Sequence, residues 1–260
     1  SELILDIFAT RAKTFQAKLQ VELAQLEYTR PRLKRMWTHL SRIEGGIGTR
    51  GPGEKQLEVD KRIVSRKIHD LRKKLHEVEK RQERLVASRK EFFTVSIVGY
   101  TNAGKSTLMN ALTEIDTFVE DKLFATLDTK TSICTLENGK KVLMSDTVGF
   151  IQKLPHHLVS SFKATLEEAR HADLLLHVAD MSSPLVHKQI EAVNAVLKEL
   201  GCDKKAPIMV LNKIDAIKED AIIPLLQSRY KDCILISAKT HQGIQDLKRR
   251  IEKMLERSFM

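Results

Sequence analysis

The sequence predicts an α/β fold with a doubly wound, mostly parallel sheet, preceded by an antiparallel helical coiled-coil hairpin. Apolar residues recur every seven positions from Leu57 to Leu85, which is the pattern of a coiled-coil seam. From Phe92 onward, continuous apolar runs alternate with helical patterns, as they do in a parallel sheet covered by helices. Asn138-Gly139 separates two further runs and marks one antiparallel hairpin within that sheet.

We expect two domains, residues 1–91 and residues 92–260, and their charges differ. The 260-residue chain has a net charge of +10, and residues 30–91 supply all of this excess, with nineteen Lys or Arg against nine Asp or Glu. Such a local basic field favours a polyanion such as nucleic acid as partner. A solvated helical surface is the alternative interpretation.

The composition excludes several other classes of protein. The three cysteines are far apart in the sequence and form no Cys-x-x-Cys pair, which disfavours a disulfide scaffold or a zinc site. We find no apolar run of membrane-spanning length and no leader pattern. We therefore expect a soluble, cytoplasmic protein.

The N-terminal region predicts two helices that pair with each other. The apolar face of the first follows helical spacing through Phe8, Ala12, Phe15, Leu19, Leu23 and Leu26, and Pro31 should kink or restart this helix. The seam of the second is formed by Leu57, Val64, Leu71, Val78 and Leu85, with Ile68 and Leu75 between them. Because neither helix can bury its stripe alone, we expect an antiparallel pair with residues 41–53 at the turn. This region is expected to be the truncated remnant of a larger N-terminal domain.

A glycine-rich stretch occupies the expected turn. Gly46, Gly48 and Gly51 match the dinucleotide fingerprint G-x-G-x-x-G, but that site requires a buried strand before the first glycine. The polar stretch "MWTHLSRIE" precedes it instead. We therefore interpret these glycines as a flexible hairpin tip, and its cationic side chains are Arg42, Arg50 and Lys55.

The second domain reads as alternating strands and helices. The buried strands are expected in "FFTVSIV", "ADLLLHVAD", "APIMVLNK" and "DCILISA". Helices are expected near residues 105–113, 185–200, 218–229 and 243–256.

A phosphate-binding loop lies between the first of these strands and its helix. "GYTNAGKS", from Gly99 to Ser106, matches G-x-x-x-x-G-K-[ST]. Glycines allow close backbone approach, so that backbone N–H groups and the helix N-terminus can surround phosphate oxygens. Lys105 is then expected to reach the β- and γ-phosphates and Ser106 to ligate Mg²⁺.

Three further motifs follow at successive strand ends. "DTVG" places Asp146 to hold Mg²⁺ through water and the Gly149 N–H to sense the γ-phosphate. "NKID" places Asp215 to accept hydrogen bonds from guanine N1–H and N2–H₂, which adenine cannot offer. "SAK", residues 237–239, can meet the guanine oxygen through backbone N–H groups. The four motifs together predict a guanine-nucleotide site.

The sequence identifies the residues that would catalyse hydrolysis less uniquely than those that would bind the nucleotide. In "LFATLDTKT", Thr126 is expected to close over Mg²⁺ and the γ-phosphate, with Thr129 or Thr131 as alternatives. Phe150 follows "DTVG" and cannot polarise water as a glutamine would. Asn102 either helps to bind a monovalent cation near the phosphates or stabilises the loop by a local hydrogen bond.

The stretches "GGIGTRGPGE", "GYTNAGKST", "FATLDT" and "DTVGFIQKLPHHLVSSF" resemble the HflX family of translation-associated GTPases, in the Obg-HflX superfamily of the TRAFAC class. The resemblance covers nearly the whole chain and implies a helical domain followed by a P-loop G domain. It implies binding to the large ribosomal subunit, with the tip residues Arg42, Arg50 and Lys55 contacting 23S rRNA. It also implies K⁺, beside Mg²⁺, as a cofactor candidate at Asn102. Two departures are a missing or minimal α/β element before the hairpin and Thr129 in place of the usual proline.

The sequence thus predicts a Mg²⁺-dependent GTPase, slow without the ribosome, whose GTP state controls docking to the large subunit in ribosome splitting or rescue. The alternative is a regulatory GTPase that dimerises through its heptads and assembles a protein complex. We expect a monomer without integral membrane association.

The expected catalytic residues are Lys105, Thr126, Gly149 and Asn102, and Ser106, Thr126 and Asp146 are the expected metal ligands. The nucleotide-binding residues are expected to be Gly99, Tyr100, Thr101, Asn102, Ala103, Gly104, Lys105, Ser106, Thr107, Phe124, Ala125, Thr126, Asp146, Thr147, Val148, Gly149, Asn212, Lys213, Asp215, Ser237, Ala238 and Lys239.

Overall fold

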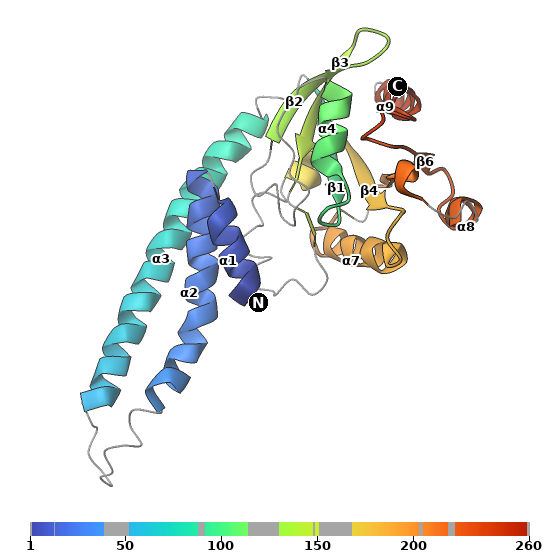
Figure 1. Ribbon diagram of the computed structural model, residues 1–260. Helices are drawn as coiled ribbons and strands as arrows, with labels where there is room; N and C mark the ends of the chain where they lie inside the picture. Colours follow the sequence, from blue (N-terminus) through green and yellow to red (C-terminus); the bar gives the residue numbers. More distant parts are fainter. Residues whose placement is uncertain are drawn as a thin grey trace. The chain divides into compact units, whose positions relative to one another are not determined.

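The computed structural model shows two compact units (Figure 1). One consists of helices from residues 2–87 and the other is an α/β unit from residues 92–258. The residues that the structure describes are 2–12, 14–38, 52–87, 92–113, 130–147, 149–150, 168–202, 205–217 and 222–258.

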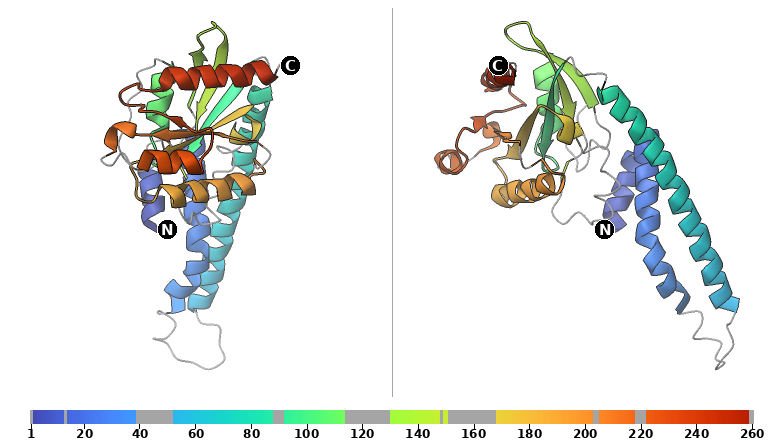
Figure 2. Two further views of the ribbon diagram at one scale, coloured as in Figure 1. Left: turned by 90° about the vertical axis from the view of Figure 1, so that its right-hand side faces the viewer. Right: turned by 180° about the vertical axis from the view of Figure 1, so that it is seen from behind.

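The helical unit is an antiparallel hairpin with a short additional helix. Its helices are α1 (Glu2–Arg11), α2 (Phe15–Thr38) and α3 (Pro52–Ala87). Figures 1 and 2 show α2 and α3 side by side and running in opposite directions. Their shared core consists of Leu19, Leu23, Leu26, Val64, Ile68, Leu71 and Leu75. It confirms the middle of the predicted seam, whereas the side chains of Leu57 and Leu85 lie outside the described residues.

The sequence did not predict how α2 begins. Helix α1 ends at Arg11 and α2 begins at Phe15. The Ala17 N–H donates to the Thr14 hydroxyl oxygen at 3.1 Å, so Thr14 caps the new helix. This start places Phe15, expected in the apolar face, on the surface with 67% of its area exposed. Of the two effects predicted at Pro31, the restart is wrong, because α2 continues through this residue to Thr38, and the kink stays a prediction.

The α/β unit is built on a six-stranded sheet in the order β2-β3-β1-β4-β5-β6. The strands are β1 (Phe93–Gly99), β2 (Lys130–Thr135), β3 (Lys141–Asp146), β4 (Leu174–Asp180), β5 (Ile208–Asn212) and β6 (Ile234–Leu235). Among these described strands, β2 and β3 pair antiparallel and the other neighbours pair parallel. Strands β2 and β3 join at Gly139, whose φ of +78° is accessible to glycine at little cost. The predicted doubly wound sheet with one hairpin is confirmed.

Helices cover both faces of this sheet (Figure 2). On one face, α4 (Lys105–Thr113) and α9 (Ile244–Ser258) pack on β1 and β4 in a single apolar cluster. On the other, α7 (Val186–Glu199) and α8 (Ile222–Arg229) pack on β4 and β5. A short 3₁₀ turn, η1 (Ile214–Ala216), follows β5. None of the helices among the described residues is both long and apolar enough to cross a membrane.

Candidate functional site

The sequence motifs meet where the parallel strands end. Strand β1 lies between β3 and β4, and the helices that follow β1 and β4 cover opposite faces of the sheet. Such a reversal opens a crevice at the carboxyl ends of the strands, which is the usual ligand position in open α/β sheets. Asp146 ends β3, Asp180 ends β4 and Asn212 ends β5.

The loop after β1 is held tightly against its neighbours. The Thr101 N–H donates to the Phe150 carbonyl at 2.7 Å, and the Phe150 N–H donates to the Gly99 carbonyl at 3.1 Å. Gly104 has φ of +89°, and a Cβ there would lie 2.3 Å from Asn212 Nδ2. A side chain is therefore excluded at Gly104 by backbone conformation and by space, as expected for a loop that must approach a ligand.

A buried ammonium group lies within this loop. Lys105 is only 6% exposed, and its Nζ donates to the Tyr100 carbonyl at 2.9 Å. Burial lowers the pKa of Lys105 to about 8, and the negative charge of Asp146 opposes this shift. A desolvated cation beside backbone N–H groups is suited to binding an anion such as phosphate.

Two oxygen-bearing side chains next to this lysine fit a magnesium ion. The Ser106 hydroxyl donates to Asp146 Oδ2 at 2.6 Å, and Asp146 is fully buried. Mg²⁺ binds oxygen ligands and usually keeps several waters when one or two side chains and substrate phosphates hold it. Ser106 and Asp146 are thus a suitable donor set, whereas Thr126, the third expected ligand, lies outside the described residues.

One amide side chain joins the phosphate loop to two other strand ends. The buried Asn212 donates from Nδ2 to the Ala103 carbonyl at 2.9 Å, and its Oδ1 accepts from the Ala238 N–H at 3.0 Å. Because both ends of the amide are used, Asn212 connects the loops that follow β1 and β6. The predicted supporting role of this residue thus has a defined geometry.

The carboxylate expected to read guanine is also held in place. Asp215 lies in η1 and is exposed, and the Ser237 hydroxyl donates to its Oδ1 at 2.6 Å. Ser237 in turn accepts from the Thr240 N–H at 3.1 Å. The exposed carboxylate therefore has a defined orientation rather than rotating freely.

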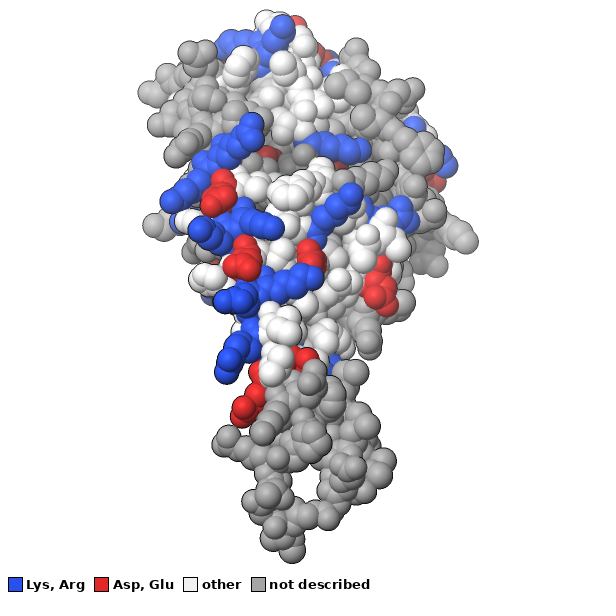
Figure 3. Space-filling view, turned by 90° about the vertical axis from the view of Figure 1, so that its left-hand side faces the viewer, with Lys and Arg blue, Asp and Glu red and all other residues white. Residues whose placement is uncertain are grey.

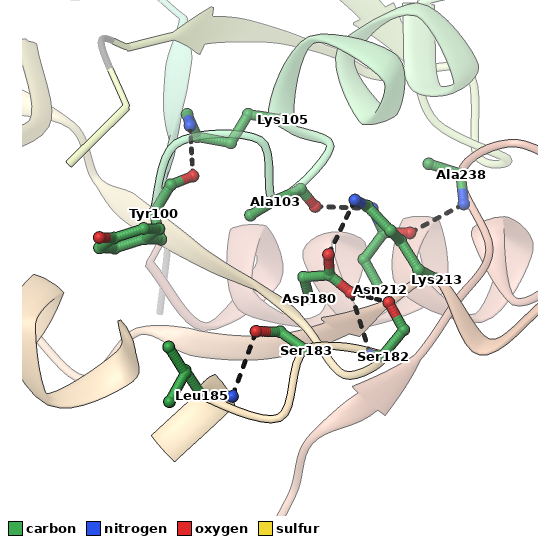
Figure 4. A network of polar contacts seen from close by, with 10 residues as sticks. All are labelled: Tyr100, Ala103, Lys105, Asp180, Ser182, Ser183, Leu185, Asn212, Lys213 and Ala238. Carbon is green, nitrogen blue, oxygen red and sulfur yellow. Dashed lines mark hydrogen bonds and ion pairs between the residues drawn. The ribbon is translucent and has the colours of Figure 1, made fainter. Parts of the chain in front are cut away.

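A further carboxylate at this edge was not predicted. Lys213 Nζ lies 2.8 Å from Asp180 Oδ2, and Figure 4 shows Asp180 between Lys213 and Ser182. Asp180 lies next to Asn212 in the register of β4 and β5. Its position at the carboxyl end of a buried apolar strand was the sequence signal that could have identified it.

The structure brings most of the predicted nucleotide residues to one edge of the sheet, and their roles in binding stay predictions. Thr147 is turned away, since its hydroxyl donates to the Ile97 carbonyl at 2.8 Å. Thr131, one alternative switch residue, lies in β2 opposite Ser145. Lys55 lies within α3, without a described side chain. Outside the described residues are Phe124, Ala125, Thr126, Thr129, Val148, Arg42 and Arg50.

Family models match both parts of the chain. Residues 11–89 match the model described as GTP-binding GTPase Middle Region, and residues 94–213 match that described as 50S ribosome-binding GTPase. The GTPase HflX of Chlamydia pneumoniae is 51% identical over 253 residues, which are 95% of this chain and 54% of that protein. The GTPase HflX of Escherichia coli K12 is 48% identical over 248 residues, or 94% of this chain and 58% of that protein. The chain thus spans a little over half the length of these relatives.

Solved structures also match this chain, at lower sequence identity than the curated relatives. A GTP-binding protein from Sulfolobus solfataricus in complex with GDP matches with a TM-score of 0.61 and 28% identity, covering 98% of this chain and 71% of that chain. Era in complex with MgGDPNP and a 16S ribosomal RNA segment matches with a TM-score of 0.52 and 22% identity, covering 63% of this chain and 56% of that chain. The second likeness shows a shared fold.

Proposed function

We propose, from the premise that this chain belongs to the HflX family of GTPases, that it is a GTP-hydrolysing switch that binds the large ribosomal subunit. The nucleotide state would control docking and release during ribosome splitting or rescue. One observation carries the proposal: three groups lie at the same edge of the sheet. They are the buried Lys105, the hydrogen-bonded pair Ser106–Asp146 and the carboxylate of Asp215, which Ser237 orients.

In this proposal each strand end has a separate task. Lys105 and the N–H groups of the glycine loop bind the phosphates, and Ser106 and Asp146 hold Mg²⁺, which neutralises phosphate charge when bound. Asp215, oriented by Ser237, accepts the guanine N–H groups. Gly149 lies close to the same loop, since a Cβ there would be 3.0 Å from Lys105 Nζ. Gly149 thus contributes an N–H near the γ-phosphate, and Thr126 completes the metal shell.

Hydrolysis by the isolated chain is expected to be slow. The Phe150 side chain is buried in an apolar cluster with Val98 and Ala169, so it neither polarises nor orients a water. Asn102 is exposed in the phosphate loop with φ of +61°. We propose that it helps to bind K⁺, so that K⁺ stimulates phosphate release more than Na⁺ at equal ionic strength.

The proposed RNA contact is supported by exposed cations along one face of α3, which alternate with the exposed acidic residues Asp70 and Glu77. Figure 3 shows Lys and Arg side chains gathered along the helical unit. Arg62, Arg66, Lys73 and Lys80 are exposed and share one side of the helix with His69, because their spacing of three, four or seven residues returns to the same face. Among the described residues these four cations form no ion pair.

Other cations of α3 are already neutralised within the hairpin. Lys67 Nζ lies 2.8 Å from Glu22 Oε1, and Arg72 donates to Glu27 Oε1 at 2.7 Å. The contrast supports a division in which the side facing α2 stabilises the hairpin and the outer side binds polyanions. Each phosphate neutralised releases counterions, so binding should weaken steeply with salt.

The alternative, dimerisation through the heptads, requires a seam that is available to a second chain. Ile68, Leu71 and Leu75 are instead only 3–5% exposed and pack on α2 of the same chain. This packing favours the ribosome-binding proposal and an expected monomer. Sedimentation velocity of the GTP-bound chain tests that expectation.

Co-sedimentation with 50S particles tests the ribosome proposal. We expect more chain in the pellet with a non-hydrolysable GTP analogue than with GDP, and less for Arg50→Glu and for the triple variant Arg62→Glu, Arg66→Glu, Lys73→Glu. The matched control has the same charge change on exposed residues of the α/β unit, Lys198→Glu, Lys231→Glu and Lys253→Glu. Binding that is equal with GDP, and insensitive to salt and to the α3 charges, would refute the proposal.

Nucleotide specificity requires its own test. Asp215→Asn replaces an acceptor by an amide that can donate to the 2-carbonyl of xanthine. The variant should lose affinity for GTP and gain affinity for XTP, as measured with fluorescent analogues. A chain that prefers ATP before and after this substitution would refute guanine recognition.

A further inference from the structure

Asp180 links the loop after β4 to the lysine beside the guanine-side carboxylate. Its Oδ2 lies 2.8 Å from Lys213 Nζ. Its Oδ1 accepts from the Ser182 N–H at 3.0 Å and from the Ser182 hydroxyl at 2.6 Å. The carboxylate therefore receives three donors, and Figure 4 shows them converging on it from two loops.

Lys213 has a backbone conformation that needs support. Its φ of +68° lies in the left-handed region, which is uncommon for residues other than glycine and often occurs at functional sites. The following residue is anchored, because the Ile214 N–H donates to the Ile236 carbonyl at 3.2 Å. The ion pair with Asp180 fixes the other end of the lysine, and the Lys213 side chain is 28% exposed.

We propose that Asp180 is a positioning residue for the guanine site, acting through Lys213. This inference rests on the proposed function. Lys213 lies between Asn212, which joins the loops, and Asp215, the proposed guanine acceptor, whose carboxylate is held by Ser237. With its ammonium group held by Asp180, the aliphatic part of Lys213 is ordered beside that position before nucleotide binds.

The benefit is a smaller entropic cost of binding. A lysine side chain that becomes ordered only when the ligand arrives loses substantial rotamer freedom, and this loss reduces affinity. An ion pair present in the free protein removes that cost for any ligand with the same base. Loss of Asp180 should therefore weaken GDP and GTP by the same factor, because the two ligands differ only in the γ-phosphate.

A purely structural role for Asp180 makes a different prediction. If the carboxylate served only to shape the turn at residues 181–183, then Ser182→Ala, which removes the 2.6 Å hydrogen bond, would weaken nucleotide binding as much as loss of Asp180. If Asp180 acts through Lys213, Ser182→Ala has little effect on affinity. Asp180→Asn retains shape and an acceptor for Ser182 while it removes the charge that attracts Lys213.

The test is a double-mutant cycle on the full 260-residue chain, with dissociation constants for a fluorescent GDP analogue and a non-hydrolysable GTP analogue. Asp180→Asn should raise both constants by about tenfold, the scale of the rotamer freedom that one lysine side chain loses when it becomes ordered. In a Lys213→Met background the same substitution should raise them less than about twofold, because the partner is already absent. Circular dichroism confirms that each variant is folded, and Asp180→Glu provides a second variant that retains the charge.

Three results overturn the inference alone. The first is an equal loss on Asp180→Asn with and without Lys213, and the second is a loss of the same size from Ser182→Ala. The third is unchanged affinity of folded Asp180→Asn. By contrast, failure of the unaltered chain to bind either guanine nucleotide overturns the proposed function itself, and the inference with it.

Discussion

Raising the pH from 7 to 9 should weaken nucleotide binding about tenfold, because the buried Lys105 loses its charge in this range. Its pKa is lowered from 10.5 to about 8, mainly by burial. In the proposed site polyphosphate binds the protonated lysine, so affinity should fall as the pH rises through the pKa of Lys105 in the nucleotide-free protein. The charged fraction drops from about 90% at pH 7 to about 10% at pH 9, which gives the tenfold loss.

The assay is a titration of a fluorescent GDP analogue at constant ionic strength across that range. Lys105→Arg is the matched control, since a guanidinium group stays charged throughout. Its affinity is expected to be lower at pH 7 but to change little up to pH 9. A flat profile for the unaltered chain, or an equal slope for Lys105→Arg, would show that deprotonation of Lys105 does not limit binding.

Three other residues give separate tests. Burial, reinforced by the charge of Lys105, lowers the pKa of His177 from 6.5 to about 4. The folded state therefore holds this histidine neutral, and its stabilising effect is complete above pH 6.5. The free energy of unfolding should fall by about 2 kcal/mol between pH 7.5 and 5, because the unfolded chain takes up the proton first. Urea denaturation should show this loss, and His177→Leu should remove it. Gly149→Ala should impair nucleotide binding and phosphate release, because the new Cβ would lie 2.7 Å from Thr101 Cα; full activity in a phosphate-release assay would contradict this. Ser237→Ala should weaken guanine binding about tenfold by releasing Asp215. It should lower the thermal midpoint by only about 2–4 °C, the cost of the Thr240 N–H losing its acceptor.

The phosphate loop and the strand ends could be predicted because their signals are local. A glycine loop between an apolar run and a helical pattern is typical of few structures other than a strand–loop–helix unit. Gly104 lies in this loop and Lys105 begins the helix, as the motif predicts. The heptad pattern likewise predicted which residues of α3 pack on α2. In each case the residues that decide the structure are near one another in sequence or repeat with a fixed period.

What could not be predicted depends on small energy differences or on distant partners. The hydroxyl of Thr14 starts a new helix and leaves Phe15 exposed, although the apolar spacing continues through this point. Pro31 is tolerated inside α2, because tertiary packing can outweigh a lost backbone hydrogen bond. Asp180 ends β4 and Lys213 directly follows β5, and only the register of β4 beside β5 brings them together.

The amide of Asn212 has a consequence for how affinity is distributed over the ligand. One side chain hydrogen-bonds to both the Ala103 carbonyl and the Ala238 N–H. A bound base that shifts the loop after β6 should therefore also shift the phosphate-binding loop after β1. Energies measured with nucleoside and with inorganic pyrophosphate separately should not sum to that of the intact nucleotide. In the proposed site, we therefore expect the hydrogen bonds of Asn212 to make base binding and phosphate binding cooperative.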